Sequence, residues 1–268
     1  MAPQATTGPA AGEAAPDRRV IEITGKDALQ FLQGLVTVDV RRLSTDDGLL
    51  YAALLSPQGK YLADFFLCRT GGRLLLDAAE SQADGLIRRL SLYKLRADVG
   101  FAESGLHVHR GRGPLPADGF ADPRHLSLGW RAYRDTPGGP IRTDWTALRV
   151  AACIPETGIE LIENDSYILE SGFERMRGVD FRKGCYVGQE VTARMHNRAE
   201  LRKGLAPVRV EGTADPGTEI RTEDNRSVGR LFSQSRGHGI AWLRFDRAKG
   251  PLRAGEAVVW IEDDPAGD

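Results

Sequence analysis

Cysteine is scarce in this sequence. Three of the 268 residues are cysteines, Cys68, Cys153 and Cys185, and they are odd in number and widely spaced. Without a Cys-x-x-Cys pair, the pattern disfavours a secreted protein held by disulfides and favours a reducing compartment. Three cysteines are also fewer than the four thiolates that commonly hold an iron–sulfur cluster. If the protein handles such clusters, we expect that it does not hold one through its own cysteines alone.

The sequence also lacks an excess of charge of one sign and a long apolar run. Its 36 Lys and Arg residues balance 37 Asp and Glu residues, so we expect neither a nucleic-acid partner nor attraction to an anionic membrane. No stretch has the length of a transmembrane helix, and the N-terminus shows no signal-peptide or transit-peptide pattern. No His-Glu-x-x-His motif occurs. We therefore expect no membrane anchor and no metal site of its own. We also expect a monomer.

Composition divides the chain into three parts. Residues 1–18 are rich in Ala, Gly, Pro and Thr and lack an apolar pattern, which predicts a disordered tail. Between residues 19 and 203, β-prone runs such as 49–55 and 61–68 are mixed with helical patterns, and this order predicts an α+β domain. Residues 204–268 contain short β-prone runs separated by Gly, Pro, Asp and Asn. This texture predicts a small C-terminal β-barrel.

The stretch around Cys185 has the features of a reactive thiol. It runs Lys183-Gly184-Cys185-Tyr186-Val187-Gly188-Gln189-Glu190, and residues 191–198 can continue it as a helix. A nearby cation and a helix N-terminus both lower the pKa of a thiol. The two glycines allow backbone conformations, or a close approach to a ligand, that a side chain would forbid. The alternative is a buried cysteine that acts as a small apolar residue.

The same stretch carries a resemblance to a known family. Its residues match the K-G-C-Y-x-G-Q-E signature of the YgfZ family of folate-binding-like proteins, which is related to the aminomethyltransferase (T-protein) of the glycine cleavage system. Residues 25–39 resemble the family's opening G-x-D-x-x-x-F-L-Q-G-L-x-T-N-D, with Val38 in place of the asparagine. Residues 56–64 resemble its P-Q-G hairpin. The resemblance implies a T-protein-like α+β fold with two similar halves over residues 19–203, followed by a small barrel.

The resemblance also implies a function and a site. The function is the assembly or repair of iron–sulfur clusters, with a tetrahydrofolate-type pocket and with assembly proteins or client enzymes as partners. In the related aminomethyltransferases, the second of two paired aspartates is the catalytic acid that faces the folate; Asp64 matches it, and Ala63 replaces the first. The implied catalytic residues are Cys185, Lys183 and Asp64. The implied folate-binding residues are Asp39, Asp64, Tyr186, Gln189 and Glu190, with Gly184 and Gly188 shaping the motif backbone.

Two other functions stay open. One is a folate-dependent, aminomethyltransferase-like one-carbon transferase in which Asp64 polarises the donor. Against it, Ala151 stands where the aminomethyltransferases have the glutamate of an R-x-E element. The other is a binding scaffold that docks through residues 173–203, where eight basic and four acidic residues give a local net charge of +4. That charge could equally line a pocket for an anionic ligand such as a polyglutamylated folate.

Structural roles are the alternatives for the individual residues. Asp39 is a common turn residue, and Asp64 could be a solvated strand end. Gln189 and Glu190 could complement the dipole of a helix start, and Tyr186 could be a packing aromatic. The Ala-, Gly- and Arg-rich composition indicates a bacterial cytoplasmic protein, with a mitochondrial matrix protein as the alternative.

Overall fold

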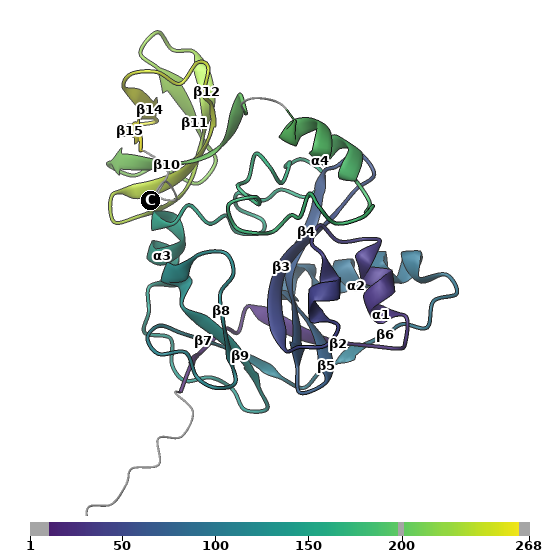
Figure 1. The fold of residues 1–268 in the computed structure, drawn as a ribbon. Coiled ribbons are helices and arrows are strands. Elements are labelled where there is room, and N and C mark those ends of the chain that lie inside the picture. The colour runs from purple at the N-terminus through teal and green to yellow at the C-terminus, as the bar shows by residue number, and fades with distance from the viewer. Residues whose placement is uncertain (1–10, 198–200, 263–268) are drawn as a thin grey trace, which may run out of the picture. The chain divides into compact units, whose positions relative to one another are not determined.

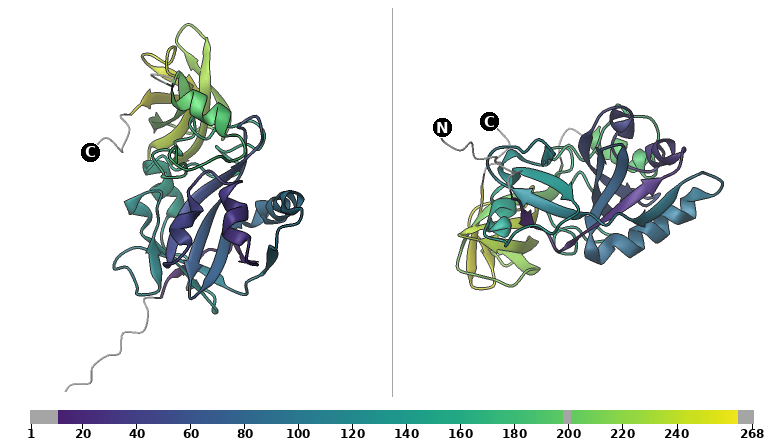
Figure 2. Two further views of the ribbon diagram at one scale, coloured as in Figure 1. Left: turned by 45° about the vertical axis from the view of Figure 1, so that its right-hand side comes forward. Right: turned by 90° about the horizontal axis from the view of Figure 1, so that it is seen from below.

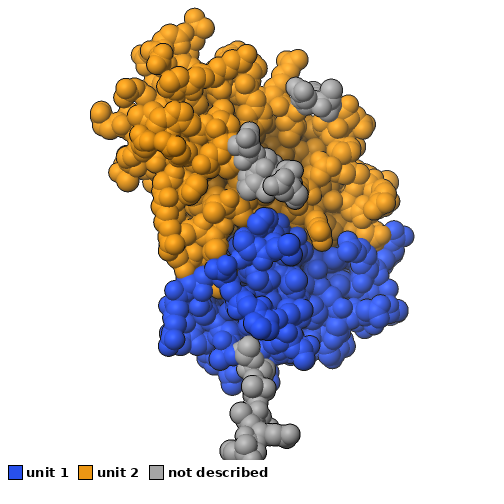
Figure 3. All heavy atoms as spheres, turned by 60° about the vertical axis from the view of Figure 1, so that its left-hand side comes forward, with its two compact units in different colours: residues 1–32, 40–50, 65–143 blue, residues 33–39, 51–64, 144–268 orange. Residues whose placement is uncertain are grey.

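Residues 11–197 and 201–262 are described in the computed structural model (Figure 1). The chain divides into two compact units, coloured separately in Figure 3. Unit 1 comprises residues 1–32, 40–50 and 65–143, and unit 2 comprises residues 33–39, 51–64 and 144–268. Each unit is described by itself below.

Unit 1 is built from two antiparallel sheets. The five-stranded sheet has the order β3-β4-β5-β2-β6, and the outer parts of the β3–β4 hairpin belong to unit 2. Its strands are β2 (Arg18–Thr24), β3 (Gly48–Leu55), β4 (Tyr61–Thr70), β5 (Arg73–Ala79) and β6 (Gly100–Glu103). The four-stranded sheet has the order β1-β7-β9-β8, with strands β1 (Glu13–Ala14), β7 (His107–Gly111), β8 (Gly119–Ala121) and β9 (Trp130–Arg134).

Helix α2 (Glu80–Lys94) packs on the larger sheet of unit 1, against β5 and β2 (Figure 2). Ala83, Leu86 and Leu90 recur at helical spacing and are its buried residues. Shorter helical segments are α1 (Ala28–Gln33), η1 (Val40–Leu43) and η2 (Leu126–Leu128). The prediction of mixed strands and helices in this part of the chain is confirmed.

A buried ion network lies inside unit 1. Asp77 is fully buried and accepts hydrogen bonds from Arg18, Arg131 and Tyr133. Arg131 also donates to Asp122, which accepts two further bonds from the Arg124 guanidinium. Each buried charge therefore has an opposite charge within hydrogen-bond distance, which is the condition under which buried ions are tolerated.

The predicted disordered tail is wrong for residues 11–18. Glu13 and Ala14 form β1 and pair with Arg110 and His109 of β7, and Arg18 opens β2 with its Nε atom 2.6 Å from Asp77 Oδ1. Composition could not show this order, because it comes mainly from backbone pairing, from one buried ion pair and from the burial of a single small side chain, Ala15. Residues 1–10 lie outside the described part.

Unit 2 contains a closed six-stranded barrel of order β10-β13-β12-β11-β14-β15. Its strands are β10 (Lys203–Glu211), β11 (Thr218–Thr222), β12 (Ser227–Ser235), β13 (His238–Arg244), β14 (Leu252–Ala254) and β15 (Ala257–Ile261). Alternate aliphatic side chains fill it, among them Val208, Leu231 and Leu243, each fully buried. The predicted C-terminal barrel is confirmed, and its first strand begins at Lys203, at the predicted boundary.

The compact units do not follow the predicted division at residue 203. The barrel belongs to the same unit as residues 33–39, 51–64 and 144–202, because α3 (Trp145–Ala151) packs on β12 and β13. Asp144 caps this helix through a 2.9 Å bond from Ala147 N. The two similar halves stay a prediction. Among the described residues, no helix is long and apolar enough to cross a membrane.

Candidate functional site

Two motifs that lie far apart in the sequence are joined at Thr37 in unit 2. The Thr37 hydroxyl is fully buried, donates to Gly178 O at 2.6 Å and accepts from Ala53 N at 2.9 Å. The Thr37 carbonyl accepts from Asp180 N at 2.9 Å. The segment 33–39 is therefore fixed to the chain that leads into the Cys185 motif.

Lys183 makes a second link between the same two segments. Its ammonium is buried and donates to Gln33 O at 2.9 Å and to Val36 O. It also lies 5.0 Å from the centroid of the Tyr186 ring. Hydrogen bonds from an ammonium to carbonyls within a protein are strong, so Lys183 holds the loop in place. Its predicted role in activating the Cys185 thiol stays a prediction.

The predicted helix after the motif is present as α4 (Gln189–His196), although Arg198 lies outside the described residues. Gly188 precedes it with φ +83°, a left-handed conformation that favours glycine. A Cβ atom on Gly188 would lie 2.6 Å from Ser56 O, so the P-Q-G turn passes directly against the helix start. A Cβ on Gly59 of that turn would lie 2.8 Å from Val191 Cβ. The close packing at Gly59 and Gly188 thus places the P-Q-G turn against the Cys185 loop and the start of α4.

Cys185 is the exposed thiol of the chain. Cys68 and Cys153 are buried, and burial together with the Asp77 charge raises the pKa of the Cys68 thiol far above its ordinary value. Since a thiol reacts and binds metals as the thiolate, the two buried cysteines are poorly placed for such chemistry. Gly184, beside Cys185, has no atom within 4 Å of the position that a Cβ would take. The thiol therefore lies on an open part of the loop.

The predicted catalytic acid, Asp64, sits in a cage of hydroxyls. Tyr61 and Thr157 each donate to Asp64 Oδ1 at 2.6 Å, and Tyr51 donates to Oδ2 at 3.0 Å. The Tyr51 ring stacks on Phe173, with centroids 5.1 Å apart. Asp64 is 6% exposed, so the alternative of a solvated strand end is wrong. A carboxylate has about four lone-pair sites, and these three hydroxyls occupy three of them.

The other predicted ligand residues have different surroundings. Burial raises the pKa of Tyr186 to about 12, partly offset by its hydrogen bond with Thr192. Gln189 is half-buried at the start of α4, and the exposed Glu190 pairs with Arg194 one turn later at 3.0 Å. Asp39 is half-buried at the end of the segment that carries Thr37. Of the three predicted carboxylate ligands, Asp64 is buried, Asp39 is half-buried and Glu190 is exposed.

Arg149, beside the position of the missing R-x-E glutamate, has a structural role. Its guanidinium pairs with Glu156 and with the buried Glu160, and it donates to the Ser233 hydroxyl of β12. Ala151 itself is exposed at the last position of α3. In the described part of the chain, no three or more His, Cys, Asp or Glu side chains are grouped so that they could hold a metal ion.

Sequence reasoning missed the residues that shape this site: Thr37 as a link, and Tyr51, Tyr61 and Thr157 as donors to Asp64. The two tyrosines flank the P-Q-G hairpin, which hints at a polar cluster. Thr157 is 93 residues from Asp64, and no local pattern connects the two. Residues 170–177 lead into the Cys185 motif as a series of turns. Gly172 and Arg177 in this segment have positive φ, which is incompatible with a continuous α-helix.

The fold is that of an aminomethyltransferase. The crystal structure of the glycine cleavage system aminomethyltransferase T from Bartonella henselae superimposes with a TM-score of 0.72, covering 96% of this chain and 86% of that one. The sequence identity of 13% limits this likeness to the fold. The predicted T-protein-like α+β fold with a small C-terminal barrel is confirmed. A family model for the CAF17 C-terminal β-barrel domain matches residues 202–263.

Sequence relatives decide the family. The chain is 31% identical to the mitochondrial iron–sulfur cluster assembly factor IBA57 of Mus musculus, over 88% of this chain and 78% of that protein. It is 30% identical to the Homo sapiens protein of the same name, over 90% of this chain and 80% of that protein. This chain belongs to the IBA57 family.

The IBA57 relatives differ in length from this chain. The chain spans 58% of the mitochondrial IBA57 homologue of Mycosarcoma maydis, to which it is 31% identical. The YgfZ family, to which the motif pointed, is related to the IBA57 family, and membership in YgfZ itself stays a prediction. In this IBA57-family chain, the Cys185 loop, the 33–39 segment and the P-Q-G turn form one packed site.

Proposed function

We propose that this protein is a factor for the assembly or repair of iron–sulfur clusters and that Cys185 supplies a thiolate to the cluster in transit. The observation that carries the proposal is that Cys185 is the one exposed thiol among three and lies on a loop fixed by Lys183, Thr37 and Gly188. The names of the IBA57 relatives support the same function.

The proposed step is a ligand exchange. The Cys185 thiol releases its proton and its Sγ forms a bond to one iron of the cluster. The carrier thiolate that leaves this iron takes up the proton, so no oxidant or reductant is consumed. One exposed cysteine supplies one of the four protein ligands that such clusters use. The remaining ligands then come from assembly proteins or client enzymes, which we propose as partners. Sulfur acceptance and reaction with a one-carbon unit are the other reactions open to the same thiol.

Complementation tests this function. Cells that lack their own homologue receive the wild type, Cys185→Ser or Arg182→Gln, and the activities of cluster-containing enzymes are measured against a cluster-free enzyme. Arg182 is the matched control, since it is exposed on the same loop. We expect Cys185→Ser to lose the cluster-dependent activities and Arg182→Gln to keep them. Full activity with Cys185→Ser at normal protein levels would refute the thiol mechanism.

We further propose that a tetrahydrofolate binds beside Asp64. The fit rests on the buried carboxylate, whose remaining lone pair can accept an N–H from a pterin ring. The exposed Glu190 is turned to Arg194 and gives this proposal no support. Bound folate would supply one-carbon chemistry. Asp64 would orient the ring, and the Tyr51, Tyr61 and Thr157 hydroxyls would hold the carboxylate in place.

Calorimetry with tetrahydrofolate under anaerobic conditions tests the folate proposal. Binding near 1 μM corresponds to about −8 kcal/mol, and we expect Asp64→Asn to weaken it at least tenfold. Asp165→Asn, an exposed control on another loop of the same unit, should bind like the wild type. Absence of binding in the wild type would remove folate from the account and leave the function to Cys185 and its protein partners.

The transferase alternative is tested separately by turnover of an aminomethyl donor, and the alanine at position 151 makes us expect none. The cellular compartment is also a proposal. The names of the relatives place them in mitochondria, which supports the mitochondrial matrix over the bacterial cytoplasm that composition indicated. Fractionation of cells that express the tagged protein at its natural level distinguishes the two.

A further inference from the structure

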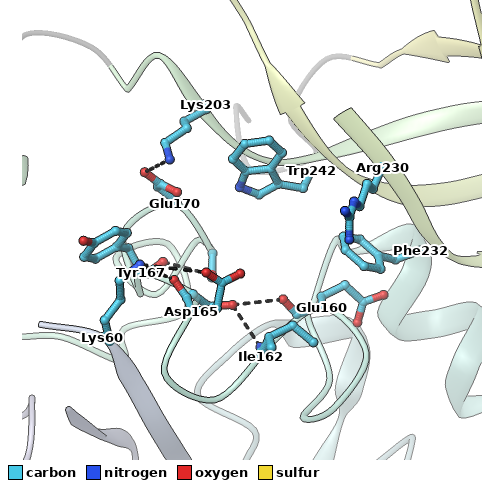
Figure 4. Close-up of a pocket in the computed structure, with 12 residues that line it drawn as sticks. Lys60, Glu160, Ile162, Asp165, Tyr167, Glu170, Lys203, Arg230, Phe232 and Trp242 are labelled. Carbon is cyan, nitrogen blue, oxygen red and sulfur yellow. Dashed lines mark hydrogen bonds and ion pairs between the residues drawn. The ribbon is translucent and has the colours of Figure 1, made fainter. Parts of the chain in front are cut away.

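A hollow of about 540 Å³ lies within unit 2. Figure 4 shows it between the loop of residues 160–171 and the outer face of the barrel. Neither Cys185 nor any predicted folate-binding residue lines it. Its volume is within the range of pockets that hold small organic molecules.

Aromatic side chains form its walls. Arg230 of β12 and Trp242 of β13 are direct cross-strand partners, and Phe232 follows two residues after Arg230, so all three project from the same outer face of the barrel. Tyr167 lies on the opposite side (Figure 4). The outer face of a small barrel is usually polar, and here it carries two large aromatic rings, Phe232 and Trp242. Neighbouring aromatic rings on a surface are typical of a site that binds a flat molecule.

Three cations surround these rings. Lys60 Nζ lies 3.8 Å from the Tyr167 ring centroid and donates to Asp165 O at 2.6 Å, which leaves two of its three N–H groups. Lys203 Nζ lies 5.2 Å from the Trp242 ring and 3.5 Å from Glu170 Oε1. Within the described residues, the Arg230 guanidinium makes no hydrogen bond or ion pair, although its side chain borders the hollow.

Of the three cations that line the hollow, Lys60 and Lys203 have a carboxylate within 4.0 Å, and Arg230 has none among the described residues. Three carboxylates line it as well, but Glu160 is fully buried and pairs with Arg149, which also pairs with Glu156, and Glu170 pairs with Lys203. The exposed Asp165 is 4.0 Å from the Lys60 ammonium. The Arg230 guanidinium lies beside Trp242 of the next strand and has no carboxylate within ion-pair distance in the described part of the chain, because Glu219, its cross-strand partner on β11, pairs with Arg221. A ring and a cation side by side match a molecule that is both flat and anionic.

We propose that this hollow binds a small molecule that carries a flat conjugated ring and an anionic group. The ring lies against Trp242 and Phe232, and the anionic group pairs with Arg230 and the free N–H groups of Lys60. This is a second site in unit 2, and it goes beyond the proposed role in cluster assembly. It requires neither Cys185 nor Asp64.

Two fluorescent probes test the proposal on the full chain. 8-Anilinonaphthalene-1-sulfonate has a flat ring system and an anionic group, and N-phenyl-1-naphthylamine has the same rings without the charge. We expect the sulfonate to bind the folded protein at one site, at least tenfold more tightly than the neutral probe. Energy transfer from tryptophan to the bound sulfonate should fall in Trp242→Phe and change less in Trp145→Phe, because Trp242 lines the hollow.

The variants give each part of the site its own readout. Arg230→Gln should weaken the sulfonate at least fivefold and leave the neutral probe unchanged, and it should fold normally because Arg230 has an exposed side chain on the barrel surface. Arg226→Gln, an exposed residue of the same barrel, is the matched control. The proposal is overturned if the two probes bind equally, if neither binds, or if Arg230→Gln has no effect. Cys185→Ser and Asp64→Asn should leave sulfonate binding unchanged.

Discussion

Thr37 Oγ1 donates a 2.6 Å hydrogen bond to the carbonyl oxygen of Gly178, 141 residues further along the chain. The same hydroxyl accepts from Ala53 N, so one buried side chain connects the opening motif, strand β3 and the loop that leads to Cys185. The position of the thiol loop thus depends on a threonine that lies outside the cysteine motif.

Thr37→Val should destabilise the protein by about 2–4 kcal/mol, because it keeps the shape of the side chain but leaves Gly178 O and Ala53 N without a partner. Thr37→Ser keeps the hydroxyl and should cost about 1 kcal/mol for the lost methyl group. Urea unfolding of the three proteins measures the difference. Equal free energies of unfolding for Thr37→Val and the wild type would mean that the two hydrogen bonds of the Thr37 hydroxyl do not stabilise the fold.

Gly188 and Gly184 form a matched pair within the motif. Gly188→Ala should destabilise the protein by more than about 2 kcal/mol, since it combines a left-handed backbone with a Cβ placed 2.6 Å from Ser56 O. Gly184→Ala has free space around its Cβ and should change stability by less than about 0.5 kcal/mol. Thermal unfolding tests both. If Gly184→Ala is stable but loses function in the complementation assay, a ligand or partner occupies that space.

The burial of the cysteines predicts how many thiols react. Brief treatment of the native protein with iodoacetamide should modify one thiol, and treatment in denaturant should modify all three. Cys185→Ser should show no modification in the native state. Intact-mass spectrometry reads the count directly. Rapid native modification of Cys68 or Cys153 would show that the protein opens more readily than the structure implies.

Acid stability should depend on Asp122. Burial alone would raise the pKa of this carboxyl, but the charges and hydrogen bonds of Arg124 and Arg131 outweigh burial and hold its pKa well below the ordinary value. The group therefore stabilises the folded state fully above the unfolded pKa of about 3.9. That stability is lost as the pH falls toward the lower, folded pKa.

Asp122→Asn removes one partner of a buried ion pair and should cost about 3 kcal/mol or more at neutral pH. The stability gap between variant and wild type should narrow as the pH falls below about 4. Melting temperatures between pH 7 and pH 3 test this, with the exposed Asp165→Asn as the control. A gap that stays constant over this interval would contradict the assignment of the low pKa.

Local patterns predicted the parts of the fold that depend on local chemistry. The short β-prone runs and the turn residues after Lys203 predicted the barrel, because each signal lies within a few residues of the strand that it specifies. Short strands such as β11 and β14 were missed, since three to five residues carry too little pattern. The Asp64 cage and the hollow beside Trp242 depend on side chains that meet only after folding, and no spacing in the sequence encodes them.

The most direct test of the central claim is iron recovered with the protein. Cells grown with radioactive iron express the tagged wild type, Cys185→Ser or Arg182→Gln, and the iron bound per chain is counted after rapid anaerobic capture. Cluster handling through Cys185 predicts iron on the wild type and on Arg182→Gln, and at least a tenfold loss on Cys185→Ser. Equal iron on all three proteins, or none on the wild type, would contradict it.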